Sequence, residues 1–110
     1  MNDALVAFDD GSARAVIDLL VYRLAAVKKA AYRVADRCTV ALGTPADEAL
    51  PVEFLFAPGT SDSAARSAVR AFYQELLDQE LREHIAEETG PLRALILAHA
   101  FSKTDLIRRR

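Results

Sequence analysis

Short stretches of the chain alternate between apolar and polar residues with the two-residue period of a β-strand. The three clearest stretches are residues 15–21, 38–42 and 52–56. Successive side chains of a strand point to opposite faces, so Val52, Phe54 and Phe56 share one apolar face. In residues 15–21 apolar side chains stand on both faces, which predicts a largely buried strand at the centre of a sheet.

The N-terminal segment, residues 1–13, is a candidate for an extra strand. Residues 5–8 are apolar and are followed by Asp9-Asp10-Gly11-Ser12. The Asp-Gly pair favours a tight turn, because both residue types tolerate positive φ. The pattern therefore indicates a strand and a turn ahead of residue 15.

Helical periodicity separates these strands and follows them. Residues 24–37 have one apolar face and one charged face, which predicts an amphipathic helix between the first two main strands. Residues 44–50 contain Pro45 and polar residues, and we interpret them as a loop. Residues 58–62, Pro-Gly-Thr-Ser-Asp, end the third main strand and supply capping oxygens, so a long helix is predicted to begin near residues 61–63.

The apolar stripe of the long helix drifts around its axis. On a wheel of 100° per residue, Phe72 and Leu76 lie together, whereas Leu77, Leu81 and Ile85 lie progressively further round. The drift predicts a change of packing partner, from the sheet to a following helix.

Thr89-Gly90-Pro91 predicts a break before that following helix, because proline disfavours helical geometry at the residue before it. Residues 91–102 are apolar almost all round, and residues 103–110 are predicted to be a frayed tail. A helix of that composition is normally buried. One possibility is that the N-terminal segment and the tail cover this helix. The other is that at least one of Leu95, Leu97 and Phe101 is exposed, in an apolar patch that docks a partner or a second copy.

The predicted fold class is α+β, in the order β-α-β-β-α-α. The sheet is small and mainly antiparallel, with three strands, or four with the N-terminal segment, and the helices pack on one of its faces. The first two main strands are either parallel neighbours or separated by the third. A length of 110 residues, 52% of them hydrophobic and 27% charged, fits a single domain over residues 1–110.

Composition narrows the function classes. A net charge of −2 gives no general attraction to nucleic acid. The longest nearly uncharged run, residues 94–101, is far below the roughly 20 residues that cross a bilayer. Acidic residues stand where a secretory signal would be basic, and Cys38 is the only cysteine, so we expect a cytoplasmic protein without an internal disulfide.

No constellation of residues predicts catalysis, a metal or a cofactor. His84 and His99 stand among apolar neighbours at no metal-binding spacing, and we interpret them as partly buried. Cys38, at the start of a strand, is interpreted as a small core residue. A radical SAM enzyme holds its iron–sulfur cluster on three cysteine thiolates, and this chain has one cysteine. The four glycines are isolated from one another and form no phosphate-binding loop. We therefore expect the protein not to be an enzyme.

Four polar residues fall together on the wheel of the long helix, opposite the apolar stripe: Glu75, Asp78, Gln79 and Arg82. Asp78 and Arg82 are spaced i,i+4, a helix pair worth about 0.2 to 0.5 kcal/mol. The stripe is either a solvated surface or a face that docks a partner.

The surrounding segment, ELLDQELRE over residues 75–83, resembles the LLNDYxLRE motif of the HxsD family of His-Xaa-Ser system proteins. The matching residues are Leu76, Asp78, Leu81, Arg82 and Glu83, and the departures are Glu75, Leu77 and Gln79. Residues 21–38 and 88–102 are similar to the helical segments of that family, in the same order and at similar spacing. The resemblance covers residues 15–106.

The resemblance implies a peptide-maturation system, in which two radical SAM enzymes modify a precursor with His-Xaa-Ser repeats and this small protein accompanies them. It implies a non-catalytic accessory protein that binds a radical SAM maturase, its precursor peptide or both. The candidate partner-binding residues are Glu75, Asp78, Gln79, Arg82, Glu83, Leu95, Leu97 and Phe101. Two alternatives stay open: a structural homodimer, and a small enzyme that uses Asp78, Arg82 and a histidine.

Overall fold

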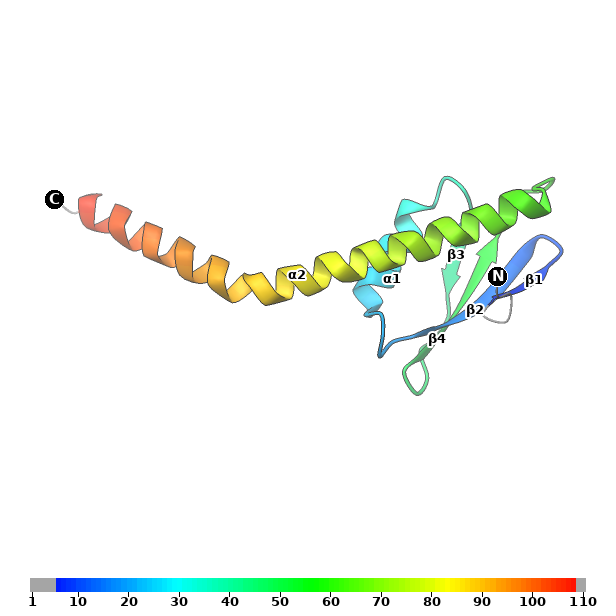
Figure 1. Cartoon of the computed structure of the whole chain (residues 1–110), viewed down its shortest axis with the longest axis horizontal. Coiled ribbons are helices and arrows are strands. Elements are labelled where there is room, and N and C mark those ends of the chain that lie inside the picture. The colour runs from blue at the N-terminus through cyan, green and yellow to red at the C-terminus, as the bar shows by residue number, and fades with distance from the viewer. Residues whose placement is uncertain (1–5, 109–110) are drawn as a thin grey trace. The chain divides into compact units, whose positions relative to one another are not determined.

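Figure 1 shows the computed structural model of the chain, which describes the backbone of residues 6–108 and the side chains of residues 6–89. The chain divides into two compact units, Met1–Glu80 and Leu81–Arg110, and each is described by itself. The single domain expected over residues 1–110 stays a prediction.

The element order is β-β-α-β-β-α. The elements are β1 (Val6–Asp9), β2 (Ser12–Asp18), α1 (Leu24–Arg33), β3 (Thr39–Leu42), β4 (Ala49–Leu55) and α2 (Asp62–Arg108). The four strands form one antiparallel sheet in the order β1-β2-β4-β3. The α+β class, the antiparallel sheet and the fourth strand are thereby confirmed.

β1 and β2 form a tight hairpin. Asp9 pairs with Ser12, so only Asp10 and Gly11 make the turn, and Gly11 has a φ of 82°. Glycine adopts that conformation without a Cβ clash, which is why the Asp-Gly pair predicted the turn. The short turn also explains why β2 begins at Ser12, three residues before the predicted start.

β2 ends at Asp18, before the predicted end at residue 21. The amide of Leu20 donates to Asp18 Oδ1 over 2.9 Å, and the amides of Val21 and Tyr22 donate to the Asp18 carbonyl oxygen. This local turn replaces ladder hydrogen bonds, as aspartate side chains commonly do. Residues 19–21 therefore lie outside the sheet.

β2 and β4 occupy the two inner positions of the sheet, and Ala15 of β2 faces Val52 of β4. The central position predicted for residues 15–21 is confirmed, and of the two arrangements left open, the third main strand separates the first two. The prediction that this strand is buried on both faces is wrong, because Val16 is 63% exposed on its outer side.

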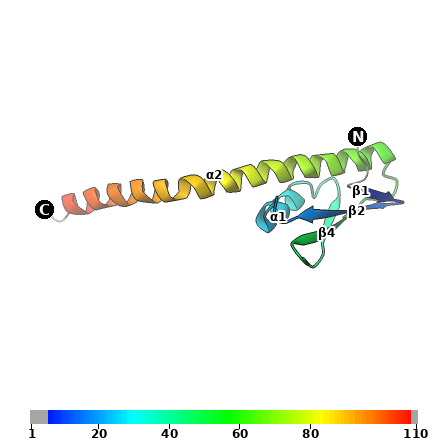
Figure 2. The ribbon, with the colours of Figure 1, turned by 60° about the horizontal axis from the view of Figure 1, so that its bottom comes forward.

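One face of the sheet carries the core of the first unit. α1 and the first part of α2, residues 62–80, lie on that face, as Figures 1 and 2 show. Phe54 of β4 meets Phe72 of α2 edge to face, with ring centroids 5.2 Å apart. Phe72 and Leu76 are fully buried, which confirms that the first half of the long helix packs on the core.

β3 and β4 are joined by a second tight turn within the predicted loop 44–50. Ala46 and Ala49 exchange two backbone hydrogen bonds of 2.9 Å, so Asp47 and Glu48 form the turn. Both residues have positive φ, 51° and 62°, as a type I′ hairpin turn requires. Aspartate tolerates this region better than glutamate, so Glu48 holds an unfavourable backbone conformation.

α2 begins at Asp62, within the predicted interval, and the Ser61 hydroxyl oxygen accepts from the amide of Ala64 over 3.1 Å. The predicted break at residues 89–91 is wrong, because α2 continues to Arg108 and includes residues 103–108 of the predicted tail. The Thr89 hydroxyl donates back to the Ile85 carbonyl oxygen over 2.8 Å, as mid-helix threonines do, and caps no new helix. Proline removes one helix donor, and a helix can continue past it.

α1 ends at Arg33, four residues before the predicted end. The amide of Cys38 then donates to the Val34 carbonyl oxygen over 3.1 Å, which leads the chain into β3. The alternation in residues 38–42 places Cys38, Val40 and Leu42 on one face, and that face is inward, because Cys38 is buried and the other two pack against the core. No helix in the described part of the chain is long and apolar enough to span a membrane.

Candidate functional site

The inward side of the motif segment, residues 75–80, is occupied by structural contacts with α1. Leu76 lies in the core. Glu75 Oε1 lies 3.8 Å from Arg33 Nε and 3.4 Å from Gln79 Nε2. Glu75 and Gln79 are therefore half-buried beside α1, whereas the wheel placed them on one polar stripe with Asp78 and Arg82, opposite the apolar stripe.

Both carboxylate oxygens of Glu80 contact Arg23. Its Oε1 accepts from the backbone amide of Arg23 over 2.9 Å, and its Oε2 lies 3.2 Å from Arg23 Nε and 3.1 Å from Nη2. Arg23 immediately precedes α1, which has no acidic residue in its first turn and no side-chain cap of its own. The Glu80 carboxylate thus supplies negative charge at the N-terminal end of α1, where exposed amides favour it.

Sequence reasoning missed Glu80, because it stands at the variable position of the motif and its partner is 57 residues away. The one available signal was the arginine immediately before a predicted helix whose first turn has no acidic residue. Because a wheel reports only the faces of one helix, it does not identify such a partner.

The outward residues of the motif segment are exposed. Asp78, Arg82 and Leu81 are exposed, and Glu83 is half-buried. Leu81 is 52% exposed and Ile85 53% exposed. The sequence predicted that the drifting stripe packs on a following helix, but in the described part of the chain α2 is continuous and these side chains are open to solvent.

His84 differs from its predicted partly buried setting. Its side chain is exposed, and Nε2 lies 3.1 Å from Glu88 Oε2 one turn along α2. His99, Leu95, Leu97 and Phe101 lie outside the residues whose side chains the structure describes. Partner binding by the predicted residues stays a prediction.

A second surface, which the sequence did not single out, lies on the outer side of α1. It is a shallow hollow of about 370 Å³, lined by Lys28, Lys29, Tyr32, Arg33 and Gln79. Tyr32 is 81% exposed, more than any other large apolar or aromatic side chain of the described residues. The sequence pattern predicted only that the helix over residues 24–37 has one charged face.

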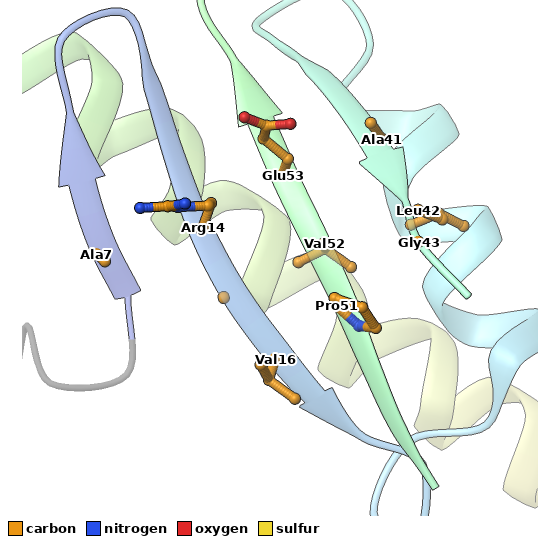
Figure 3. Close-up of a pocket in the computed structure, with 10 residues that line it drawn as sticks. Ala7, Arg14, Val16, Ala41, Leu42, Gly43, Pro51, Val52 and Glu53 are labelled. Atoms are coloured by element: carbon orange, nitrogen blue, oxygen red, sulfur yellow. The ribbon is translucent and has the colours of Figure 1, made fainter. Parts of the chain in front are cut away.

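A third surface is the outer face of the sheet, shown in Figure 3. Its hollow, of about 740 Å³, is lined by Ala7, Arg14, Ala15, Val16, Ala41, Leu42, Gly43, Pro51, Val52 and Glu53. Arg14 bonds Asp9 Oδ2 over 3.2 Å, and a Cβ at Gly43 would lie 2.9 Å from the Pro51 ring. Gly43, immediately after β3, therefore lets the chain approach Pro51 closely, and the lining of the hollow is mostly apolar.

Cys38 is a core residue in the structure. It is 5% exposed, and burial, with a smaller contribution from Asp36, raises the pKa of its thiol, which Arg37 partly offsets. Among the described residues no three His, Cys, Asp or Glu side chains gather as a metal site would require. Nothing in the described residues assigns the thiol a chemical role.

The family model described as His-Xaa-Ser system protein HxsD matches residues 17–107, which is most of the chain. No curated protein and no solved structure matches.

Proposed function

Because the chain belongs to the HxsD family of His-Xaa-Ser system proteins, we propose that it is a non-catalytic accessory protein of a His-Xaa-Ser peptide-modification system. In this proposal it binds a radical SAM maturase, the precursor peptide or both, in the cytoplasm. Its contribution is to hold partners together, and the maturase carries out the chemistry.

The exposure of Leu81 and Ile85 carries this proposal. Leu81 matches the family motif, yet more than half of its surface is open to water, and so is that of Ile85 one turn further on. Fully burying an exposed side chain of this size yields about 1.5 to 3 kcal/mol, and burying the exposed half of one yields roughly half of that. Apolar side chains exposed one turn apart on the surface of α2 support a docking role.

The test is capture of the maturase by the full chain when the two are co-expressed. Leu81→Glu should reduce the captured maturase strongly, because it places a charge in the proposed contact while glutamate keeps good helix propensity. The matched control is Val16→Glu, the same kind of change at an exposed residue of the sheet. Capture of neither maturase nor precursor by the wild type, or equal loss in both variants, would contradict the proposal.

The same exposed pair also suits the alternative of a structural homodimer, since a self-complementary surface needs apolar residues on both copies. Sedimentation of the isolated chain separates the two functions. A dimer that Leu81→Glu dissociates, with no capture of either partner, would replace the accessory role by the structural one.

A further inference from the structure

We propose that the outer surface of α1 binds an acidic segment of a partner polypeptide. The surface, here named the α1 basic hollow, consists of Lys28, Lys29, Tyr32 and Arg33 of α1 with Gln79 of α2. The proposal deepens the proposed function by giving the chemistry of one bound segment, and it rests on that function only in assigning the segment to the same peptide-modification system.

The cations of the hollow are held on a rigid support. Ala26, Val27 and Ala30 fix the inner face of α1 in the core, so the exposed side chains of α1 stand on a helix that is held in place. Lys28 and Lys29 are both exposed. α1 contains no acidic residue, so every charged side chain of the helix is basic.

Arg33 extends the basic surface toward α2. Its contact with Glu75, 3.8 Å from Nε to Oε1, is longer than a hydrogen bond, and its side chain is 62% exposed. A guanidinium has five N–H donors in a planar fork that fits a carboxylate. Arg33 therefore keeps donors facing solvent although Glu75 lies beside it.

Tyr32 adds an aromatic contact area and a hydroxyl group to the charged surface. Its ring is exposed between the cations, and its hydroxyl group is able to donate to a carboxylate. Tyrosine gives a large contact area with little loss of side-chain entropy, which is why it is enriched at interfaces. The hollow of about 370 Å³ fits a few side chains of a peptide segment, and a whole domain would need a broader surface.

Charge distribution favours an acidic polypeptide over nucleic acid. The chain has 14 basic and 16 acidic residues, so the basic character of α1 is local and does not follow from a basic protein. Glu75 and Asp78 of α2 lie within one helical turn of Gln79. Their negative charges would repel a phosphate backbone that extends beyond the hollow. A short acidic segment fits within the basic area.

The test measures binding of a fluorescently labelled glutamate–leucine peptide to the full chain by anisotropy, with a lysine–leucine peptide as the reference probe. The acidic peptide should bind more tightly, and added salt should weaken it, because screening reduces exposed ion contacts. Lys28→Glu should weaken binding about tenfold, which corresponds to about 1.4 kcal/mol. Tyr32→Ala should weaken binding of the acidic peptide. Tyr32→Phe should weaken it less, because phenylalanine keeps the ring and lacks only the hydroxyl group.

The matched control is Arg70→Glu, an equal change of charge at an exposed position of α2 outside the hollow. Equal weakening by Lys28→Glu and Arg70→Glu would show a net-charge effect and overturn the proposal. It would also be overturned by preference for DNA or anionic lipid vesicles, or by self-association that Lys28→Glu abolishes. The assay needs no maturase, so its failure is distinct from failure of maturase capture through Leu81.

Discussion

Replacing Glu80 tests whether one carboxylate fixes α1 against α2. Glu80→Ala removes the acceptor of the Arg23 backbone amide at 2.9 Å and both contacts with the Arg23 guanidinium. A hydrogen bond to a charged acceptor contributes about 1.5 to 3 kcal/mol, and a partly exposed ion pair adds about 0.2 to 1 kcal/mol. We therefore expect the free energy of unfolding to fall by about 2 to 4 kcal/mol.

Two further variants separate the parts of this contact. Arg23→Ala removes the guanidinium and leaves its backbone amide bonded to Glu80, so it should cost only about 0.2 to 1 kcal/mol. Glu80→Gln keeps an oxygen that accepts from the amide, and its cost should lie between those of the other two variants. The exposed residue Asp78 provides the control, and Asp78→Ala should change stability by less than about 0.5 kcal/mol.

The measurement is urea unfolding followed by circular dichroism and tyrosine fluorescence, which compares midpoints at a constant slope. The expected order of destabilisation is Glu80→Ala, then Glu80→Gln, then Arg23→Ala, with Asp78→Ala at the wild-type value. If Glu80→Ala unfolds at the wild-type midpoint, or no more readily than Asp78→Ala, the carboxylate does not fix α1 and the reasoning is refuted.

Four other outcomes are expected. Phe72→Ala should cost about 3 to 5 kcal/mol in the same unfolding assay, because Phe72 is fully buried against Phe54; an unchanged midpoint would contradict its core position. Glu48→Gly should raise the midpoint, because glycine adopts the positive φ of 62° without strain; a lowered midpoint would argue against the type I′ turn. The Cys38 thiol should react with iodoacetamide far more slowly in the folded than in the urea-unfolded chain, because burial hides it and raises its pKa, so less thiolate forms at a given pH; equal rates would contradict its burial. Arg82→Ala should leave the midpoint nearly unchanged and weaken maturase capture, and unfolding of the first unit instead would show that Arg82 is structural.

The raised pKa of the Cys38 thiol also sets a direction for stability at alkaline pH. Its pKa in the folded chain lies above the ordinary value of 9.0, so the unfolded chain loses this proton first as pH rises. The stability linked to Cys38 is therefore fully present below that value and is lost as pH rises through the folded pKa. Burial also raises the pKa of Tyr73 above its ordinary value of 10.0. The stability linked to Tyr73 is therefore likewise lost as pH rises through the pKa of the folded chain.

The sheet was largely predictable because its signals are local. Alternation placed Val52 and Phe54 on one face, and both are buried. The Asp10-Gly11 pair identified the first turn, whose backbone requires a positive φ at Gly11. Such features depend on neighbouring residues, which a single sequence contains.

The errors arose where distant contacts or competing local preferences decide the structure. Residues 89–91 contain strong helix-breaking signals, yet α2 continues through them, since proline perturbs a helix without always ending it. The Glu80–Arg23 contact joins residues 57 positions apart, and the α1 basic hollow depends on Gln79 lying beside α1. Periodicity predicts which face of an element is apolar, but it does not identify the residues opposite that face.

The central claim is that this chain binds a partner of a His-Xaa-Ser system. The most direct measurement is co-purification of the wild-type chain with the radical SAM maturase and with the precursor peptide, analysed by size-exclusion chromatography with light scattering. The account predicts a complex of defined mass with at least one of them, which Leu81→Glu disrupts and Val16→Glu does not. Elution of the folded chain apart from both partners would contradict it.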